Sequence, residues 1–125
     1  MGIYKIADGH NNTAGLTAVD PQPASYGIHY PRRVYATSGA VYPDGIAFTE
    51  WRYDEAISAE EYDSLLTQFG LDSAETNDVT IYTSDEHGRD FVNKNGTIIR
   101  PENPVYRLGV YERLIFLVRD LEDVT

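Results

Sequence analysis

Cysteine is absent from this chain of 125 residues, and basic residues, methionine and tryptophan are all scarce. Without cysteine the chain can form no disulfide bond, no thiolate nucleophile and no cysteine-ligated zinc site. Only 10 basic residues stand against 20 acidic ones, which gives a formal net charge of −10. Because such a charge opposes the neutralisation of phosphates, we expect no sequence-specific binding of nucleic acid.

Long apolar runs are also missing. The longest, Leu114–Val118, is far shorter than the roughly 20 residues that a membrane-spanning helix needs. The first residues carry one lysine and no apolar stretch, so we expect no signal peptide. The sequence therefore predicts no interaction with a membrane.

Tyrosine, in contrast, is abundant. Ten tyrosines, four phenylalanines and Trp51 bring the aromatic share to 12%. Tyrosine joins a large apolar face to a polar tip, which suits surfaces that contact other chains. With 42% hydrophobic residues, a chain of this length can also bury a core of its own. We expect a single β-rich domain over residues 26–125, preceded by an extended N-terminal arm over residues 1–25.

One helix is marked at both ends. The Ser58 hydroxyl can accept the backbone N–H of Glu61, and the Glu61 side chain can reach back to Ser58, which is a capping box. Gly70 supplies a left-handed stop. Between these ends, an apolar stripe at helical spacing consists of Tyr62, Leu65, Leu66 and Phe69. The pattern predicts a helix over about residues 58–69 that covers one face of a sheet.

Most other segments alternate as strands do. Residues 46–53, 78–83 and 108–121 are expected to be strands, and the last is apolar on both faces in its middle, as a buried central strand would be. Besides the helical stripe, the expected core positions are Phe48, Trp51, Val79, Ile81, Leu114, Phe116 and Val118, and Thr80 and Tyr82 are expected to point outward. The predicted fold class is mainly β (α+β), a β-sandwich or half-barrel with one flanking helix.

Turn residues predict how these strands are joined. Pro43-Asp44-Gly45 favours a turn, because proline presets its backbone angle and glycine tolerates a positive one. Asn95-Gly96 favours a type I′ turn between two short strands. Residues 84–89 are expected to connect two further strands.

Contacts with other chains are expected near the N-terminus. The arm of residues 1–25, in which Asp20–Pro23 is extended, is expected either to cross a neighbouring subunit or to be disordered. The candidate interface residues are Tyr4, Pro21, Pro23, Tyr26, Tyr30, Arg32 and Arg33.

No stretch of the sequence carries a catalytic motif. Three histidines are far apart and lack metal-binding spacing: His10, His29 and His87. Glu50 and Asp54 flank Trp51, as they would in a glycosidase or a sugar-binding site. Among 20 carboxylates such pairs are mostly solvated, and a lone tryptophan in an alternating strand is more often part of the core. We expect no enzymatic activity, no cofactor and no metal.

The order of several segments resembles that of a known group of proteins. These segments are Phe48–Trp51, Ile57–Tyr62, Leu65–Leu66, Phe69–Leu71, Val79–Tyr82, Asn95–Pro101 and Tyr111–Glu122. In this succession of strand, capped helix and hairpin, the chain resembles small tail structural proteins of long-tailed (siphovirus-like) bacteriophages, of the tail-tube or distal-tail type.

The resemblance implies a virion structural protein that acts by self-assembly and carries no catalytic residue. Its subunits would form a homo-oligomeric ring, commonly a hexamer, and contact other tail proteins. The protein would be made in the host cytoplasm and reside in the virion tail. An acidic lumen in such a ring would let DNA pass without adhering, because like charges repel.

Two other functions remain open from the sequence. A capsid decoration (cement) protein is also small, β-rich and assembled in symmetric copies, and a trimer would favour it. A monomeric carbohydrate-binding module would use Trp51 and exposed tyrosines, and would lose binding when Trp51 is replaced by alanine.

Overall fold

The computed structural model describes residues 3–30, 32–35, 41–44, 47–85, 87–101 and 104–125, and the side chains of residues 32–35 and 41–44 lie outside this description. The elements are, in order, β1 (Lys5–Asp8), the 3₁₀ turn η1 (Thr13–Gly15), β2 (Thr17–Ala18), β3 (Arg32–Tyr35), β4 (Val41–Asp44), β5 (Ala47–Tyr53), β6 (Ile57–Ser58), α1 (Ala59–Phe69), β7 (Thr76–Ser84), β8 (Phe91–Ile99), β9 (Val105–Arg107), β10 (Val110–Glu112) and β11 (Leu114–Asp123). Over these residues the chain is mainly β with one α-helix, as the sequence predicts.

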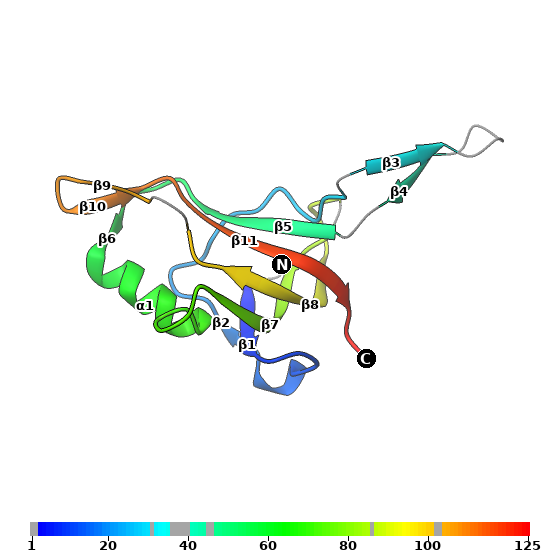
Figure 1. Ribbon diagram of the computed structural model, residues 1–125, viewed down its shortest axis with the longest axis horizontal. Coiled ribbons are helices and arrows are strands. Elements are labelled where there is room, and N and C mark those ends of the chain that lie inside the picture. The colour runs from blue at the N-terminus through cyan, green and yellow to red at the C-terminus, as the bar shows by residue number, and fades with distance from the viewer. Residues whose placement is uncertain (1–2, 31, 36–40, 45–46, 86, 102–103) are drawn as a thin grey trace.

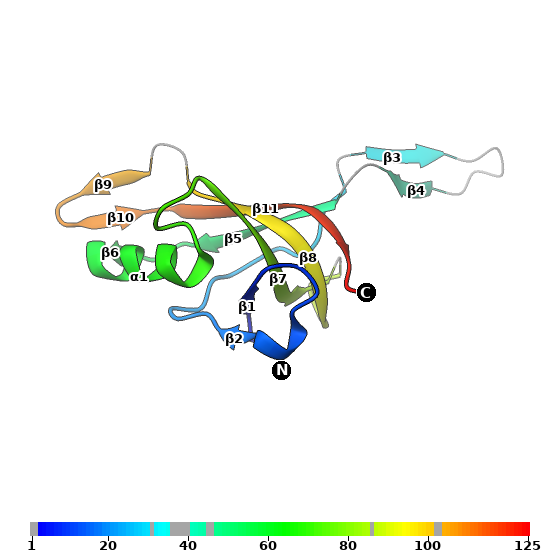
Figure 2. The same ribbon diagram turned by 60° about the horizontal axis from the view of Figure 1, so that its bottom comes forward.

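A six-stranded antiparallel sheet, in the order β2-β1-β7-β8-β11-β5, forms the body of the molecule. A three-stranded sheet, β6-β10-β9, extends from one end of it, and the β3–β4 hairpin projects at the other end (Figure 1). The large sheet is strongly twisted and curves around the side that carries α1 (Figure 2). Because the smaller sheets extend from its ends and do not stack on its face, the fold matches the predicted half-barrel better than a sandwich.

The predicted helix and its caps are confirmed. Glu61 N–H donates to Ser58 Oγ at 3.1 Å, and Ser58 N–H donates to Glu61 Oε1 at 3.1 Å. Gly70 ends the helix in the left-handed region, with φ of 72°. The four residues of the apolar stripe are all buried.

The helix covers the concave face of the sheet through aromatic contacts. The Phe69 ring lies 4.8 Å from the Phe116 ring and 5.7 Å from the Trp51 ring, both edge to face. Inside this core, Trp51 Nε1 donates to Thr83 Oγ1 at 3.1 Å, so the one polar atom of the indole is satisfied. The predicted core positions confirmed on the strands are Trp51, Val79, Ile81, Leu114, Phe116 and Val118.

Phe48 is the core prediction that is wrong. It alternates with the buried Ala47 and Thr49, so its side chain leaves the strand on the convex face. There it is half-buried, and its ring contacts the His29 ring at 5.6 Å. The sequence offered aromatic residues on both faces of this strand, and only the face that carries Trp51 meets the helix.

The prediction of an extended arm over residues 1–25 is also wrong. β1 is an inner strand, paired with β2 on one side and β7 on the other. Ile6 and Val19 are 3% and 1% exposed and belong to the core. The Gln22 side chain accepts from Tyr4 N–H at 2.8 Å and donates to Tyr4 O at 2.9 Å. The segment is integrated because its own apolar residues complete the core of the same chain.

The segment after it covers the edge of the large sheet. Ala24 and Arg52 exchange two backbone hydrogen bonds of 2.8 Å, and His29 and Phe48 exchange two of 2.8 and 2.9 Å. These bonds occupy backbone groups of β5 that would otherwise form an open edge.

The hairpin predicted at Asn95-Gly96 does not exist, because both residues lie within the continuous strand β8. Against β8, the neighbouring strand β11 shifts its register between Arg119 and Glu122, and the side chains of Val118 and Leu121 lie against Gly96. A Cβ at residue 96 would be 2.8 Å from Leu121 Cδ2 and 2.8 Å from Val118 Cγ1. Glycine is therefore required here for close packing and not for a turn.

The single strand predicted over residues 108–121 is interrupted. Leu108 and Gly109 form the turn between β9 and β10, and Arg113 separates β10 from β11 with φ of 54°. At the other predicted turn, Pro43 and Asp44 lie in β4, while Gly45 is outside the described residues. The connection predicted at residues 84–89 is confirmed between β7 and β8.

Replacing Gly96 by alanine tests the packing role of this residue. We expect G96A to lower the free energy of unfolding by about 1–3 kcal/mol, because the added methyl group must displace two core side chains or the strand that carries them. Chemical denaturation measures the change. Asn93→Ala, an exposed position on the same strand, is the control and should change stability little. Equal stability of G96A and the wild type would contradict the close packing described above.

Candidate functional site

The convex face of the large sheet carries an apolar strip with no covering helix in the described part of the chain. Ile115 and Leu117 on β11 alternate with buried residues and therefore point away from the core, and Ile99 is paired with Leu117 from β8. Ile115 is 37% exposed. Between these side chains lies an open hollow of about 300 Å³, lined by Ile99, Arg100, Pro101, Ile115 and Leu117.

A second apolar feature is the β9–β10 hairpin. Its turn residue Leu108 is 98% exposed, and Val105 and Tyr106 on β9 are 51% and 52% exposed. Leu108 has φ of 54°, a left-handed conformation that glycine or asparagine adopts far more readily than leucine. β9 is also the outer strand of its sheet, so one of its sides pairs with no other strand among the described residues.

The hairpin is held on the body by stacked tyrosines. The Tyr111 ring lies 4.7 Å from the Tyr106 ring across the hairpin and 4.3 Å from the Tyr62 ring of α1. Desolvation and the neighbouring Tyr62, together with the negative charge of Asp63, raise the pKa of Tyr111. The inner side of the hairpin is therefore anchored, and its turn extends away from the body (Figure 1).

Charged residues stand beside both apolar features. Glu50 on β5 is paired directly with Leu117, so its side chain leaves the sheet next to the hollow. Arg107 precedes the exposed Leu108 at the hairpin turn. No ion pair joins Glu50 or Arg107 to another residue within the described ranges.

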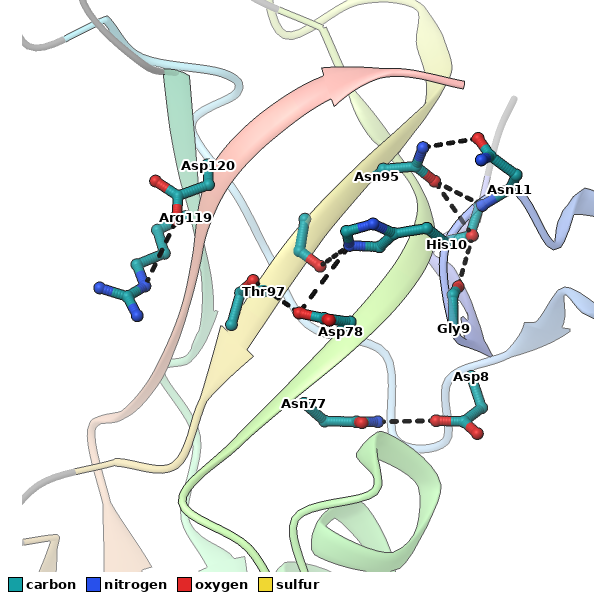
Figure 3. Close-up of polar contacts among 12 residues, drawn as sticks. Asp8, Gly9, His10, Asn11, Asn77, Asp78, Asn95, Thr97, Arg119 and Asp120 are labelled. Atoms are coloured by element: carbon teal, nitrogen blue, oxygen red, sulfur yellow. Dashed lines mark hydrogen bonds and ion pairs between the residues drawn. The ribbon is translucent and has the colours of Figure 1, made fainter. Parts of the chain in front are cut away.

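The opposite half of the convex face is covered by the loop after β1. Asn11 N–H donates to Asn95 Oδ1 at 2.8 Å, Asn95 Nδ2 donates to Asn11 Oδ1 at 2.7 Å, and Thr80 Oγ1 donates to Gly9 O at 2.7 Å (Figure 3). Asn12 N–H completes the contact by donating to Thr80 Oγ1 at 2.9 Å. Thr80, expected to point outward, does leave the sheet on the side opposite Val79 and Ile81, but it is fully buried under this loop.

The same loop brings His10 near Asp78 and Thr97, a combination that invites comparison with a catalytic relay. Thr97 Oγ1 donates to Asp78 at 3.0 Å, while His10 Nε2 lies 3.1 Å from Gly96 O and 3.9 Å from Asp78 (Figure 3). A carbonyl oxygen only accepts, so Nε2 carries the hydrogen. The hydroxyl thus binds the carboxylate and not the imidazole, whereas a nucleophile needs the base beside it. The arrangement holds the loop and does not activate Thr97.

The predicted interface residues differ in how far they are buried within the chain itself. Tyr4 and Pro23 belong to the chain's own core region: the Tyr4 ring contacts the Trp51 ring at 5.7 Å, and Pro23 is buried. Pro23 therefore has almost no surface left for another chain, whereas Tyr4 is half-buried and its role in an interface stays a prediction. Pro21 is half-buried.

Two further interface candidates, Tyr26 and Tyr30, are exposed at the surface. Tyr26 is 71% exposed, although its ring lies 5.0 Å from the Arg52 guanidinium, and Tyr30 is 38% exposed. Both remain candidate contact residues. Arg32 and Arg33 lie in β3, with side chains outside the described part of the chain.

The candidate catalytic and sugar-binding groups do not form a site around Trp51. Trp51 is 0% exposed, so its indole cannot stack on a sugar in this fold. Glu50 lies on the convex face, opposite the Trp51 side chain, and Asp54 is exposed beyond the end of β5. Neither carboxylate therefore forms a site with the indole. Across the described residues, no group of three His, Cys, Asp or Glu side chains is arranged to hold a metal ion.

A wider cleft of about 400 Å³ lies between the N-terminal segment and the loop after β5. Its charged lining residues are Arg52, Asp54, Glu55 and Glu61. At its floor, Tyr53 Oη donates to Pro21 O at 2.7 Å. Burial, with a contribution from the charge of Asp20, raises the pKa of Tyr53 well above its ordinary value. This hydrogen bond fixes the N-terminal segment on β5.

Comparison of the chain with family models, curated proteins and solved structures found no match. In the described ranges, no helix combines the length and apolar composition needed to cross a bilayer.

Sequence reasoning missed both apolar features of the candidate surface. Alternation in residues 108–121 did place Ile115 and Leu117 on the face opposite Phe116, but both faces were expected to be covered. The signal for the turn was Gly109, which follows Leu108 and has φ of 84°. The apolar residues around it favoured a continuous strand instead.

Tyr53→Phe tests the attachment of the N-terminal segment and its pH dependence. Loss of the bond to Pro21 should lower stability by about 1 kcal/mol at neutral pH. In the folded wild type the raised pKa keeps Tyr53 neutral, whereas the unfolded chain ionises near its ordinary value of 10.0. The stabilisation is therefore complete below about pH 10 and declines as the pH rises further.

Denaturation at pH 8 to 11.5 measures this effect as the difference between wild type and Y53F. The difference should shrink above pH 10, because phenylalanine does not titrate. A difference that stays constant over this range would contradict a buried, hydrogen-bonded Tyr53.

Proposed function

We propose that this protein is a virion structural subunit of a long-tailed bacteriophage, a tail component of the tail-tube or distal-tail type that acts by assembly with copies of itself and with other tail proteins. The proposal assigns no catalytic residue and no cofactor. The observation that carries it is the pair of apolar surfaces, the β9–β10 turn and the convex strip, on a chain with a net charge of −10.

Exposed apolar surface next to such a charge favours a role in assembly. A strongly acidic protein gains solubility from its charge and gains nothing from a leucine that is 98% exposed. Contiguous apolar surface rimmed by polar residues is typical of interfaces between proteins. The open side of β9 adds a place where a neighbouring chain can pair.

The β3–β4 hairpin supports the same role. It extends from the body and pairs with no other strand within the described residues (Figure 1). A two-stranded hairpin on its own is marginally stable in water. In a ring, this hairpin would gain support from a neighbouring subunit.

The acidic composition fits a tail component that contacts DNA only in passing, because like charge disfavours adhesion of the genome to the lumen. A carbohydrate-binding module is disfavoured, because Trp51, on which that function depended, is fully buried. A capsid decoration protein would share these features, and the stoichiometry in solution decides between the two virion roles.

The first test is the mass of the purified chain by light scattering over a range of concentrations. We expect a species of six chains, visible as a ring with a central opening by negative-stain microscopy. Deleting residues 1–25 is unsuitable as a control, because Ile6 and Val19 belong to the core and the truncated chain should unfold.

A trimer would move the assignment to the capsid, and a monomer at every concentration would contradict self-assembly. An antibody against the chain, applied to virions that contain it, provides the second test. Labelling of the tail is expected, and labelling of the head alone would overturn the tail assignment.

A further inference from the structure

We propose that the β9–β10 turn of one copy inserts Leu108 into the convex hollow of a second copy, in a head-to-tail contact. This inference rests on the proposed function and names the partner and the contact surfaces of the assembly. The knob is the hairpin turn with Leu108, and the hole is the hollow between Ile99, Ile115 and Leu117.

The knob is an apolar side chain kept at an unfavourable backbone position. Leu108 has φ of 54° and follows Arg107 in a turn where asparagine or glycine would be less strained. Leu108 is 98% exposed, so no burial within its own chain offsets the strain of this backbone conformation. The tyrosine stack beneath the hairpin holds the turn in place, which limits the entropy lost when it docks.

The hole is mainly apolar, open and preformed, and Arg100 is the charged residue in its lining. Ile99 and Leu117 are neighbours across β8 and β11, and Ile115 lies on the same face two residues before Leu117. Pro101 also lines their hollow of about 300 Å³. Strands fix these positions, so a docking side chain meets a rigid surface.

Two observations identify a second copy as the occupant. First, the chain carries both halves of the contact, and the exposure of Leu108 means that it does not fill the hollow of its own chain. Second, opposite charges stand beside the two features: Arg107 adjoins the knob, and Glu50 on β5 is paired with Leu117, on the side of β11 away from the lining residue Arg100. Insertion of the knob into the hole would bring Arg107 of one copy near Glu50 of the other, and this attraction favours the orientation in which the two residues meet.

Because knob and hole are different surfaces, the contact is heterologous. Each copy keeps a free knob and a free hole after one contact forms, so the assembly grows until it closes. Closure by rotation gives a ring, whereas a contact of a surface with itself would stop at a dimer.

The test uses knobless and holeless variants, separately and mixed. Leu108→Asn removes the knob and suits the left-handed turn, so its melting temperature should equal or exceed that of the wild type. Ile115→Thr with Leu117→Thr removes the hole and keeps strand-forming, outward-pointing residues. Each variant should associate about 10- to 100-fold more weakly than the wild type, as expected for the loss of a buried leucine-sized contact.

Mixing the two variants provides the decisive measurement. The knob of the holeless copy can still enter the hole of the knobless copy, so light scattering should show a one-to-one complex that grows no further. Ile3→Asn, which replaces another exposed apolar residue (46% exposed), is the matched control and should assemble as the wild type does.

A charge exchange tests the register. Arg107→Glu and Glu50→Arg should each weaken association, and the two changes in one chain should restore it. This test involves no core residue, so it remains informative if an apolar variant folds poorly.

Each outcome separates the contact from the general role. Assembly of the wild type together with undiminished assembly of both apolar variants would overturn the knob-in-hole contact and leave the proposed function standing. The absence of a mixed one-to-one complex from two folded, weakened variants would exclude the head-to-tail geometry. A wild type that remains monomeric at all concentrations would overturn the proposed function itself.

Discussion

The contact between one helix and one face of a curved sheet determines the rest of this structure. Phe69 of α1 meets Trp51 and Phe116 edge to face, and this cluster closes the concave side of the six-stranded sheet. The chain has a single α-helix in its described part, so the convex side receives no such cover. Every question about function therefore concerns what the convex side and the projecting hairpins do.

The convex side is divided into two halves by polar chemistry. Over β7 and β8, the loop after β1 is fixed through Asn11, Asn95 and Thr80, and their hydrogen bonds bury polar groups without leaving them unsatisfied. Over β11 and the end of β8, apolar side chains lie open around a hollow. One half of the convex side is thus covered by the chain itself, and the other half leaves apolar side chains open. The open half is the surface on which the proposed contact depends.

Charge sets a further condition on that partner. At a net charge of −10, two copies repel each other at long range, so the proposed contact would depend on short-range apolar burial and on its charge pair to overcome this repulsion. Such contacts are individually weak, so an assembly built from them depends on closure, where each subunit makes contacts on both sides. The same repulsion would act on DNA inside a ring, which connects the composition to the proposed tail function.

Local signals in the sequence determined the helix, its caps and the alternating core of β5, β7 and β11, because a capping box and a hydrophobic period act over a few residues. Tertiary contacts decided the rest. Gly96 was predicted to form a turn but lies within a strand. Glycine is required there because the Val118 and Leu121 side chains occupy the space that a Cβ atom would fill. The N-terminal residues fold into the sheet because Ile6 and Val19 fill a core that the sequence alone does not locate. The candidate surface likewise exists only in the folded chain: Leu108, Leu117 and Glu50 acquire their relation through strand pairing, which joins residues far apart in sequence.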